Sequence, residues 1–420
     1  MGAFTIDMAA FFLPGIGLFW LILGLYGIFT AIFFLNRRTE ENADSASGVS
    51  AHSESSPPTK GKPNLRQSRP RAVVISSSFL LVLVGYLSLW FSELQVGAKP
   101  IAVSQPPETE SQLAEIVTQT VEREFDRNAH VGMIVGAVAD GEEILLGFGN
   151  RRVGESEPVD ADTVFEIGSI SKTFTGILLA KRVENGDLNL DDPIVDLLPE
   201  GWKLSKAAQG ITLRHLTTHT SGLPRLPPNL LGLTTVFKPL FGGDPYRHYT
   251  EENLREALET VELDFAPGTD RTYSNFAVGL LGFLLATHNG TDYETLLQTE
   301  LCGPLGMERT ASINDDWHLD HFAEGYRTTA KAGSMLLAME SDQWLLPNPL
   351  AGAGGIRSTG TDMMKFLKAN MGLVSTPLDA AIELSHEEIY KENDFRSMGM
   401  NWIRDFEDDL SQNILWHNGG

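Results

Sequence analysis

The chain has 420 residues, of which 32 are Lys or Arg and 55 are Asp or Glu, so its formal net charge is −23. Residues 1–99 carry 8 basic and 6 acidic side chains, and the acidic excess therefore lies in residues 100–420. Such an acidic surface repels phosphate backbones, which argues against nucleic-acid binding. The single cysteine, Cys302, excludes an internal disulfide framework and a cysteine-rich zinc site.

Two uncharged apolar runs near the N-terminus predict transmembrane helices, at 8–35 and at 72–91, because about 20 apolar residues are enough to cross a bilayer. The loop between them, 36–71, is rich in Ser, Pro, Lys and Arg and is predicted to be disordered. Its basic excess places it on the cytoplasmic side. We therefore expect a multi-pass membrane protein whose residues after 91 lie outside the cytoplasm. A buried core helix is the alternative for the second run.

A linker is expected at 92–108, and the remaining residues, 109–420, are expected to form one domain. Apolar residues at helical spacing predict an amphipathic helix at 110–125. The pair Asp140-Gly141 then indicates a hairpin turn, since both turn positions need positive φ. The flanking apolar runs predict its two strands, at 131–139 and 143–148.

The rest of this domain alternates between strand-like and helical segments. Asn185-Gly186 is typical of a helix C-terminus and ends a helix predicted at 172–184. Strands at both ends around a helical middle indicate an α+β fold, in which helices flank an antiparallel sheet and form a helical insertion. The expected strands are 397–404 and 413–417, with a strand-like run at 165–167 that leads into the helix, and the helical middle is 202–300.

Ser169-Ile-Ser-Lys172 is the only Ser-x-x-Lys sequence in the chain. A strand-like run precedes it and a helix follows, so Ser169 is expected at a helix N-terminus, where developing negative charge is favoured. Lys172 lies on the same helical face. A serine becomes nucleophilic when a base takes its proton, and Lys172 can be this base if its pKa falls from ~10.4 to near 7. A capping serine with a solvated lysine is the alternative.

Tyr273-Ser-Asn275 is a second candidate motif, placed between a Pro-Gly turn and an apolar helix. A tyrosine beside a cationic lysine can have a lowered pKa and shuttle protons. The neighbouring Asn275 can hold a substrate amide. A tyrosine that only caps the helix and packs is the alternative.

The sequence His-x-Gly occurs three times, at His130, His288 and His417. The first precedes a strand and the second ends a helix, which are ordinary structural positions. Only His417-Asn-Gly419 follows an apolar strand after the other two motifs. Lys331-Ala-Gly333 is a further candidate for the same role, but no strand-like run is evident before it.

The order Ser-x-x-Lys, Tyr-x-Asn, His-x-Gly resembles that of the penicillin-recognising serine hydrolases, and the last two motifs resemble the class C β-lactamase-related branch. The likeness runs from about Leu113 to the last residue. It implies a β-lactamase/transpeptidase-like fold. Further matching phrases lie at Phe165–Lys172, Leu190–Pro193, Leu216–Leu223, Pro304–Met307 and Gly354–Thr359.

The resemblance also implies a role for each motif. Ser169 would be the acylated nucleophile, with Lys172 and Tyr273 as the proton-transfer pair. The backbone N–H groups of Ser169 and of Gly420 would form the oxyanion hole. The substrate-binding residues would be Asn275, His417, Gly419 and Gly420. No metal or cofactor is implied, and the substrate would be a small molecule or a peptidoglycan-like peptide.

The chain ends at Gly420, inside the strand that should carry the oxyanion donor, and members of the resembled family continue through further strands and a helix. We therefore expect the C-terminal part of the domain to be missing. The expected function is that of a membrane-anchored serine hydrolase acting on an amide or ester. The alternative is a membrane-tethered sensor of penicillin or peptidoglycan that is acylated without efficient turnover.

His215 and His219 are spaced as in a zinc helix. The glutamate of His-Glu-x-x-His is replaced by Leu216, however, and no third ligand is evident. A metal site is therefore not expected here.

Overall fold

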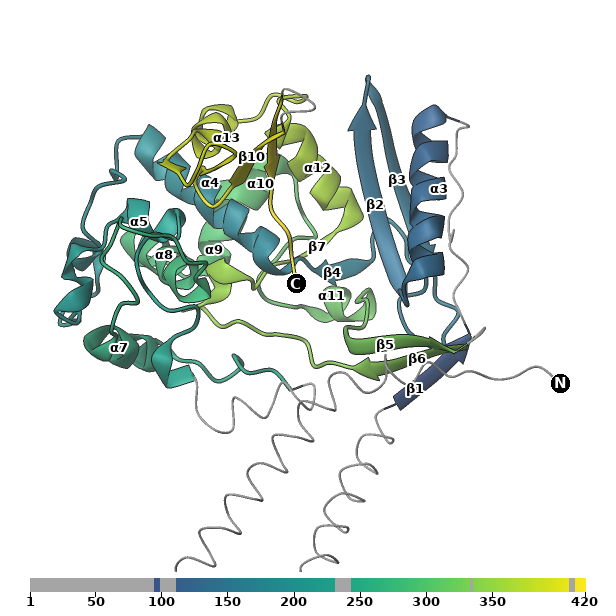
Figure 1. Ribbon diagram of the computed structural model, residues 1–420, viewed down its shortest axis with the longest axis horizontal. Helices are drawn as coiled ribbons and strands as arrows, with labels where there is room; N and C mark the ends of the chain where they lie inside the picture. The colour runs from purple at the N-terminus through teal and green to yellow at the C-terminus, as the bar shows by residue number, and fades with distance from the viewer. Residues whose placement is uncertain (1–93, 99–110, 231–242, 333–334, 408–411) are drawn as a thin grey trace, which may run out of the picture. The chain divides into compact units, whose positions relative to one another are not determined.

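The computed structural model describes residues 94–98, 111–230, 243–332, 335–407 and 412–420 (Figure 1). All of them except Leu94 belong to one unit, residues 95–420. The predicted transmembrane helices, the loop between them and most of the predicted linker lie outside these ranges. Within the ranges, no helix combines the length and apolar character that a membrane span requires.

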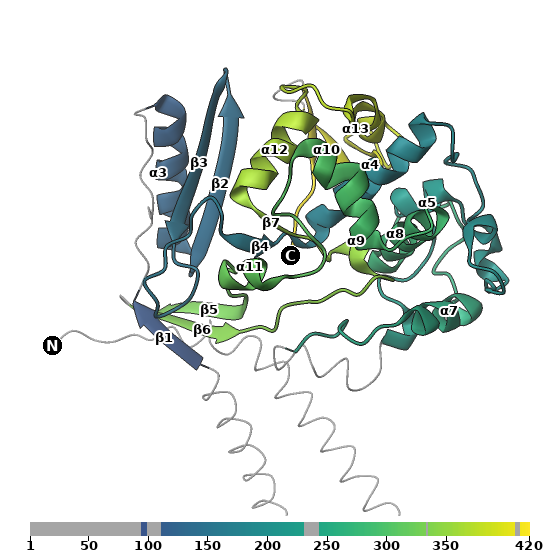
Figure 2. The same cartoon turned by 180° about the vertical axis from the view of Figure 1, so that it is seen from behind.

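The described part of the domain begins with the predicted helix and hairpin. Ser111 caps α3 (Gln112–Arg127) by accepting a hydrogen bond from Ala114 N–H at 3.0 Å. Strands β2 (Gly132–Ala139) and β3 (Glu142–Gly149) are antiparallel, and their turn residues Asp140 and Gly141 have φ of 52° and 81°. Figures 1 and 2 show the hairpin between α3 and α12 (Gly360–Asn370), and both helices contact it.

The C-terminal strands form a four-stranded antiparallel sheet in the order β11-β10-β9-β8. The prediction of one strand at 397–404 is wrong in detail, because the chain turns between two strands there. Asn401, with φ of 60°, lies in this turn and is incompatible with an extended strand. The strands are β8 (Tyr390–Lys391), β9 (Arg396–Met398), β10 (Ile403–Glu407) and β11 (Gln412–Trp416).

Besides β8, four strands of the described residues were not predicted from the sequence. Strand β7 (Arg357–Thr359) pairs with the expected short strand β4 (Val164–Glu166). Strands β5 (Tyr326–Ala332) and β6 (Met335–Glu340) form a hairpin, and β6 also borders β1 (Leu94–Ala98), which lies within the predicted linker. The expectation that no strand precedes Lys331 is therefore wrong.

The predicted helical middle is confirmed. Its longest helix, α8 (Asn275–His288), is buried from Phe276 to Ala286, as expected for a helix that is apolar on every side. The other α-helices of the described residues, inside and outside this middle, are α4 (Ser171–Glu184), α5 (Leu213–Thr217), α7 (Glu251–Thr260), α9 (Tyr293–Leu297), α10 (Gly303–Leu305), α11 (Asp316–Asp320) and α13 (Asp379–His386).

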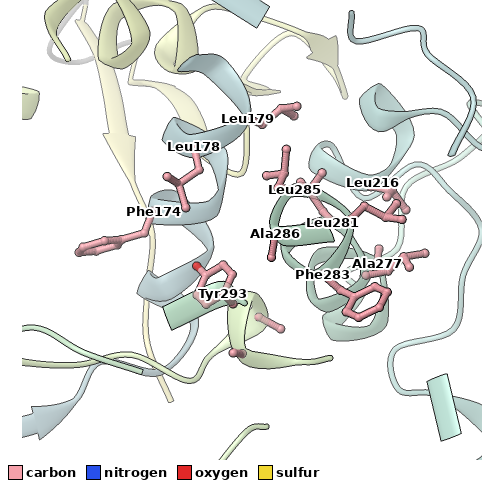
Figure 3. Close-up of a cluster of buried hydrophobic side chains, with 14 of the residues drawn as sticks. Phe174, Leu178, Leu179, Leu216, Ala277, Leu281, Phe283, Leu285, Ala286 and Tyr293 are labelled. Carbon is pink, nitrogen blue, oxygen red and sulfur yellow. The ribbon is translucent and has the colours of Figure 1, made fainter. Parts of the chain in front are cut away.

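One large apolar cluster joins α4, α5, α8 and α9 (Figure 3). Helix α4 contacts α8 and α13, and its Phe174 ring stacks on Phe366 of α12 with a centroid distance of 4.2 Å. Because protein interiors are closely packed and resist deformation, this cluster holds the N-terminal ends of α4 and α8 in fixed positions. Two of the three motifs singled out from the sequence lie at these ends.

Candidate active site

The start of α4 and the segment leading into α8 bring three polar side chains together. Ser169 lies in a 3₁₀ turn, Gly168–Ile170, directly before α4, and Lys172 lies in the first turn of that helix. Lys172 Nζ donates a hydrogen bond to Ser169 Oγ at 3.0 Å, and the Tyr273 hydroxyl donates to the same oxygen at 2.6 Å. The serine oxygen therefore touches both groups that were expected to exchange protons with it.

Lys172 is fully buried and also donates a hydrogen bond to the carbonyl oxygen of Ala353. Burial lowers the pKa of Lys172 well below 10.5, and the positive charge of Arg225 acts in the same direction. Removing an amine from water disfavours its charged form. The geometry and this shift together favour a neutral amine that can accept a proton from Ser169.

Tyr273 is half-buried, and its pKa is raised rather than lowered. Burial is the main cause, while the hydrogen bond to Ser169 and the positive charges of Arg225 and Arg271 act in the opposite direction. The expectation of a lowered tyrosine pKa is therefore wrong, because loss of hydration outweighs the nearby cations. Tyr273 is a protonated phenol at neutral pH and can donate a proton.

His219, which the sequence presented only as a weak metal-ligand candidate, packs against Tyr273. The two ring centroids are 4.6 Å apart, and His219 Nδ1 accepts a hydrogen bond from Ser274 N–H at 3.2 Å. His219 lies beyond the end of α5 with φ of 62°, so it does not share a helical face with His215. Burial keeps the pKa of His219 well below 6.5, which leaves a neutral ring supporting the tyrosine.

Asn275 is the first residue of α8, and its N–H donates to the carbonyl oxygen of Arg225 at 2.9 Å. Its side-chain oxygen, Oδ1, is buried and has no hydrogen-bond partner among the described residues. A buried acceptor without a partner carries a free-energy cost that a ligand N–H can relieve. The side chain is thus suited to receive an amide.

His417 also reaches this site, since its ring centroid lies 6.4 Å from that of Tyr273. Burial lowers the pKa of His417 to about 4, so this imidazole is neutral at pH 7. The other two His-x-Gly sequences lie elsewhere: His130 packs beside Phe125 near the β2–β3 hairpin, and His288 is at the far end of α8 from Asn275.

The last two residues lie against the turn that carries Ser169. A Cβ atom on Gly168 would come within 2.8 Å of Gly420 N, and one on Gly419 within 2.3 Å of Ile167 O. Gly168 has φ of 53°, so both its backbone conformation and this close approach require glycine. The backbone of Gly420 therefore borders the nucleophile turn, as an oxyanion donor must.

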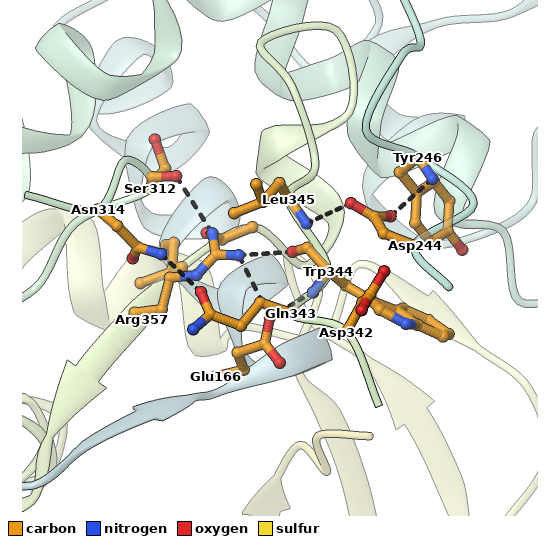
Figure 4. A network of polar contacts seen from close by, with 12 residues as sticks. Glu166, Asp244, Tyr246, Ser312, Asn314, Asp342, Gln343, Trp344, Leu345 and Arg357 are labelled. Atoms are coloured by element: carbon orange, nitrogen blue, oxygen red, sulfur yellow. Dashed lines mark hydrogen bonds and ion pairs between the residues drawn. The ribbon is translucent and has the colours of Figure 1, made fainter. Parts of the chain in front are cut away.

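A second layer of polar contacts holds the segment that binds the lysine (Figure 4). Arg357 is 1% exposed, and it donates hydrogen bonds to Gly355 O at 2.6 Å and Trp344 O at 2.6 Å. It also pairs with Glu166 on the neighbouring strand at 3.2 Å. Gly355 lies two residues after Ala353, so Arg357 holds the backbone next to the carbonyl oxygen that Lys172 contacts.

The model of one protein family, described as Beta-lactamase, matches residues 114–420. The chain belongs to the beta-lactamase family. It is 28% identical over 309 residues to a beta-lactamase of Yersinia enterocolitica, with 71% of each chain covered. It is 29% identical over 284 residues to the D-alanyl-D-alanine-carboxypeptidase/endopeptidase AmpH of Escherichia coli strain K12, covering 67% of this chain and 68% of AmpH.

Among solved structures, the D-alanine carboxypeptidase AmpC from Burkholderia cenocepacia aligns with a TM-score of 0.56 at 30% identity. The alignment covers 70% of this chain and 75% of that structure. The resemblance inferred from the three motifs is therefore confirmed, as is the β-lactamase-like α+β fold. As a beta-lactamase family member, the protein is a serine hydrolase.

Arg225 and His219 are the residues near Tyr273 that sequence reasoning missed. Arg225 follows directly after the phrase Leu216–Leu223 and Pro224, and its guanidinium carbon lies 5.2 Å from the centroid of the Tyr273 ring. The position of Arg225 next to a family phrase was the available signal. Nothing in its local sequence indicated that it would meet a motif about fifty residues later.

Proposed function

We propose that this protein is a membrane-anchored hydrolase that cleaves an amide or ester bond through an acyl-enzyme on Ser169. The observation that carries the proposal is the contact of Ser169 Oγ with both Lys172 Nζ and the Tyr273 hydroxyl. Two proton-transfer groups on one hydroxyl match what a serine nucleophile needs.

In acylation, neutral Lys172 takes the Ser169 proton while Oγ attacks the substrate carbonyl carbon. The carbonyl oxygen becomes an oxyanion, which the N–H groups of Ser169 and Gly420 stabilise by about 3–4 kcal/mol each. The intermediate collapses when the bond to the leaving nitrogen or oxygen breaks, and that atom receives a proton from Tyr273, which Lys172 restores. Asn275 Oδ1 accepts the N–H of the substrate amide, and His417 borders the substrate.

In deacylation, a water molecule attacks the ester carbon, and the same lysine–tyrosine pair takes its proton and returns one to Ser169 Oγ. The leaving group of this second step is the Ser169 oxygen, which is released as the free hydroxyl. Peptidoglycan D-Ala peptides, β-lactams and small esters are the substrate classes that fit this chemistry. We place a D,D-peptidase or a general amide or ester hydrolase ahead of a dedicated β-lactamase. Similarity to AmpH and to a D-alanine carboxypeptidase agrees with the first, and similarity to the beta-lactamase of Yersinia enterocolitica agrees with the second.

Turnover distinguishes this hydrolase from an acylated sensor. We expect the full chain to release product from a chromogenic ester or cephalosporin over many cycles, and to lose bound fluorescent penicillin over time. The measurement pairs steady-state product release with gel fluorescence after the free penicillin has been removed. A label that persists on the protein without product release would instead identify a sensor.

We also propose that residues 8–35 and 72–91 anchor the protein, with the loop 36–71 in the cytoplasm and the hydrolase domain outside. The support is the uncharged character of the two runs and the basic excess of the loop.

This topology predicts the labelling of two reporter cysteines, Ser50→Cys in the loop and Glu122→Cys on the exposed side of α3. In intact cells a membrane-impermeant maleimide should label the second reporter and reach the first only after lysis. Because Cys302 is buried, the background from the natural cysteine should be low. If only the loop reporter were labelled in intact cells, the proposed orientation would be wrong, because the loop would lie outside the cell and the hydrolase domain inside.

A further inference from the structure

The surroundings of the nucleophile are positive although the whole domain is acidic. Burial is the largest cause of the pKa shifts of Lys172 and Tyr273, but the positive charge of Arg225 acts on both groups and that of Arg271 acts on Tyr273. Burial is the main cause of the lowered pKa values of His219 and His417, and the positive charge of Arg271 lowers both further. A concentration of positive charge in a site on an acidic protein favours an anionic ligand there.

Besides Lys172, which is neutral in the proposed mechanism, two arginines act on the pKa of Tyr273, and one of them already has a carboxylate partner. Lys172 is buried and bonded to Ser169 and Ala353. Arg271 forms an ion pair with Glu392 at 3.0 Å, and its side chain is 13% exposed.

Arg225 is different, because it is exposed and no carboxylate of the described residues pairs with it. Its guanidinium carbon lies 5.2 Å from the Tyr273 ring centroid, compared with 4.9 Å for Lys172 Nζ. An arginine that stacks on a ring keeps its N–H groups free to bind a carboxylate in a bidentate manner.

The backbone fixes Arg225 beside the residue that is suited to hold the substrate amide. The carbonyl oxygen of Arg225 accepts hydrogen bonds from the N–H groups of Asn275 at 2.9 Å and Phe276 at 3.3 Å. Asn275 Oδ1 is the buried acceptor without a partner. The backbone thus joins Arg225 to Asn275, and the Arg225 guanidinium carbon lies 5.2 Å from the ring centroid of Tyr273, two residues before Asn275.

We infer that Arg225 is a specificity-determining residue that binds a carboxylate on the part of the substrate lying beside Asn275. The inference rests on the proposed acyl-enzyme function and narrows its substrates to acyl groups that carry a negative charge. The arginine would form a charge-assisted hydrogen bond with that carboxylate, in a position that the core of α8 holds rigid.

The test compares two esters with the same leaving group and the same six-carbon acyl chain: mono(4-nitrophenyl) adipate, which is anionic, and 4-nitrophenyl hexanoate, which is neutral. We expect Arg225→Gln to lower kcat/KM for the adipate about tenfold, mainly through KM, and to change the hexanoate value by less than about twofold. Any effect of Arg225 on Lys172 would act on both esters equally. Arg225→Lys should retain part of the preference for the adipate.

The matched control is Arg123→Gln on α3, which removes one exposed arginine far along the chain from the site. It should leave the ratio of the two kcat/KM values unchanged, and added NaCl should weaken the adipate preference of the wild type. Equal losses on both esters in Arg225→Gln would overturn the role of Arg225 while leaving the hydrolase intact. Failure of the wild type to hydrolyse either ester faster than Ser169→Ala would overturn the proposed function, and the inference with it.

Discussion

Replacing Ser169 with alanine should reduce hydrolysis of 4-nitrophenyl hexanoate or a chromogenic cephalosporin by about 10⁴- to 10⁶-fold, to near the uncatalysed rate. The reason is that the attacking oxygen is lost, while Lys172 and Tyr273 act only on the proton of that oxygen. The measurement is steady-state product release with purified full chain.

Ser171→Ala is the matched control for this variant. Ser171 lies two residues away in α4, but its hydroxyl accepts a hydrogen bond from Ile356 N–H at 3.1 Å instead of facing Ser169. Losing this bond should cost about 1 kcal/mol of stability and leave most of the activity. An equally large loss of activity in both variants would mean that the helix start, and not the Ser169 hydroxyl, matters.

Lys172→Met should lower kcat/KM by about 10²- to 10⁴-fold. This is the usual contribution of a general base, and the variant lacks the amine that acts as one. In the wild type, activity should rise as the pH rises through the lowered pKa of Lys172, since only the neutral amine can accept the serine proton. The variant should lose this rise. The measurement is a pH profile of kcat/KM for both proteins.

The same variant should not be less stable at neutral pH. Because burial lowers the pKa of Lys172 in the folded protein, the unfolded chain holds this proton more tightly. The amine therefore costs folding free energy below the unfolded pKa of about 10.4, and the full cost is reached below the folded pKa. Methionine removes this cost, so urea unfolding at pH 7 should show equal or greater stability. A strong loss of stability would mean that reduced activity reflects misfolding.

Elements that depend on nearby residues could be predicted from the sequence. The Asp140-Gly141 turn, the helix after Ser169 and the apolar helix α8 are each specified within about fifteen residues, and all three form as expected. Their local signals do not depend on the rest of the fold.

Elements that depend on distant partners could not be predicted. Strand β7 is only three residues long and is formed by pairing with the distant strand β4, where Arg357 lies opposite Glu166. The turn near Asn401 interrupts a run that is apolar enough to resemble one strand. Short strands carry too little periodicity to be distinguished from loops.

In the candidate site, too, the contacts that depend on nearby residues could be predicted from spacing, and those that depend on distant partners could not. Ser169 and Lys172 share one helix turn, so their contact followed from spacing, and the contact with Tyr273 followed from the family resemblance. The direction in which the pKa of Tyr273 shifts could not be predicted. Burial, which the sequence does not reveal, has a larger effect on this pKa than the nearby charges. Arg225 was missed because a backbone hydrogen bond to Asn275 brings it into the site.

The location of the covalent intermediate tests the account most directly. The full chain is mixed with a fluorescent penicillin, quenched with acid within seconds, digested with trypsin and examined by tandem mass spectrometry. Acyl transfer through the Ser169 oxygen predicts a mass increase on Ser169 that is absent from Ser169→Ala and strongly slowed in Lys172→Met. An acyl group on any other side chain, with Ser169 unmodified while penicillin is consumed, would contradict it.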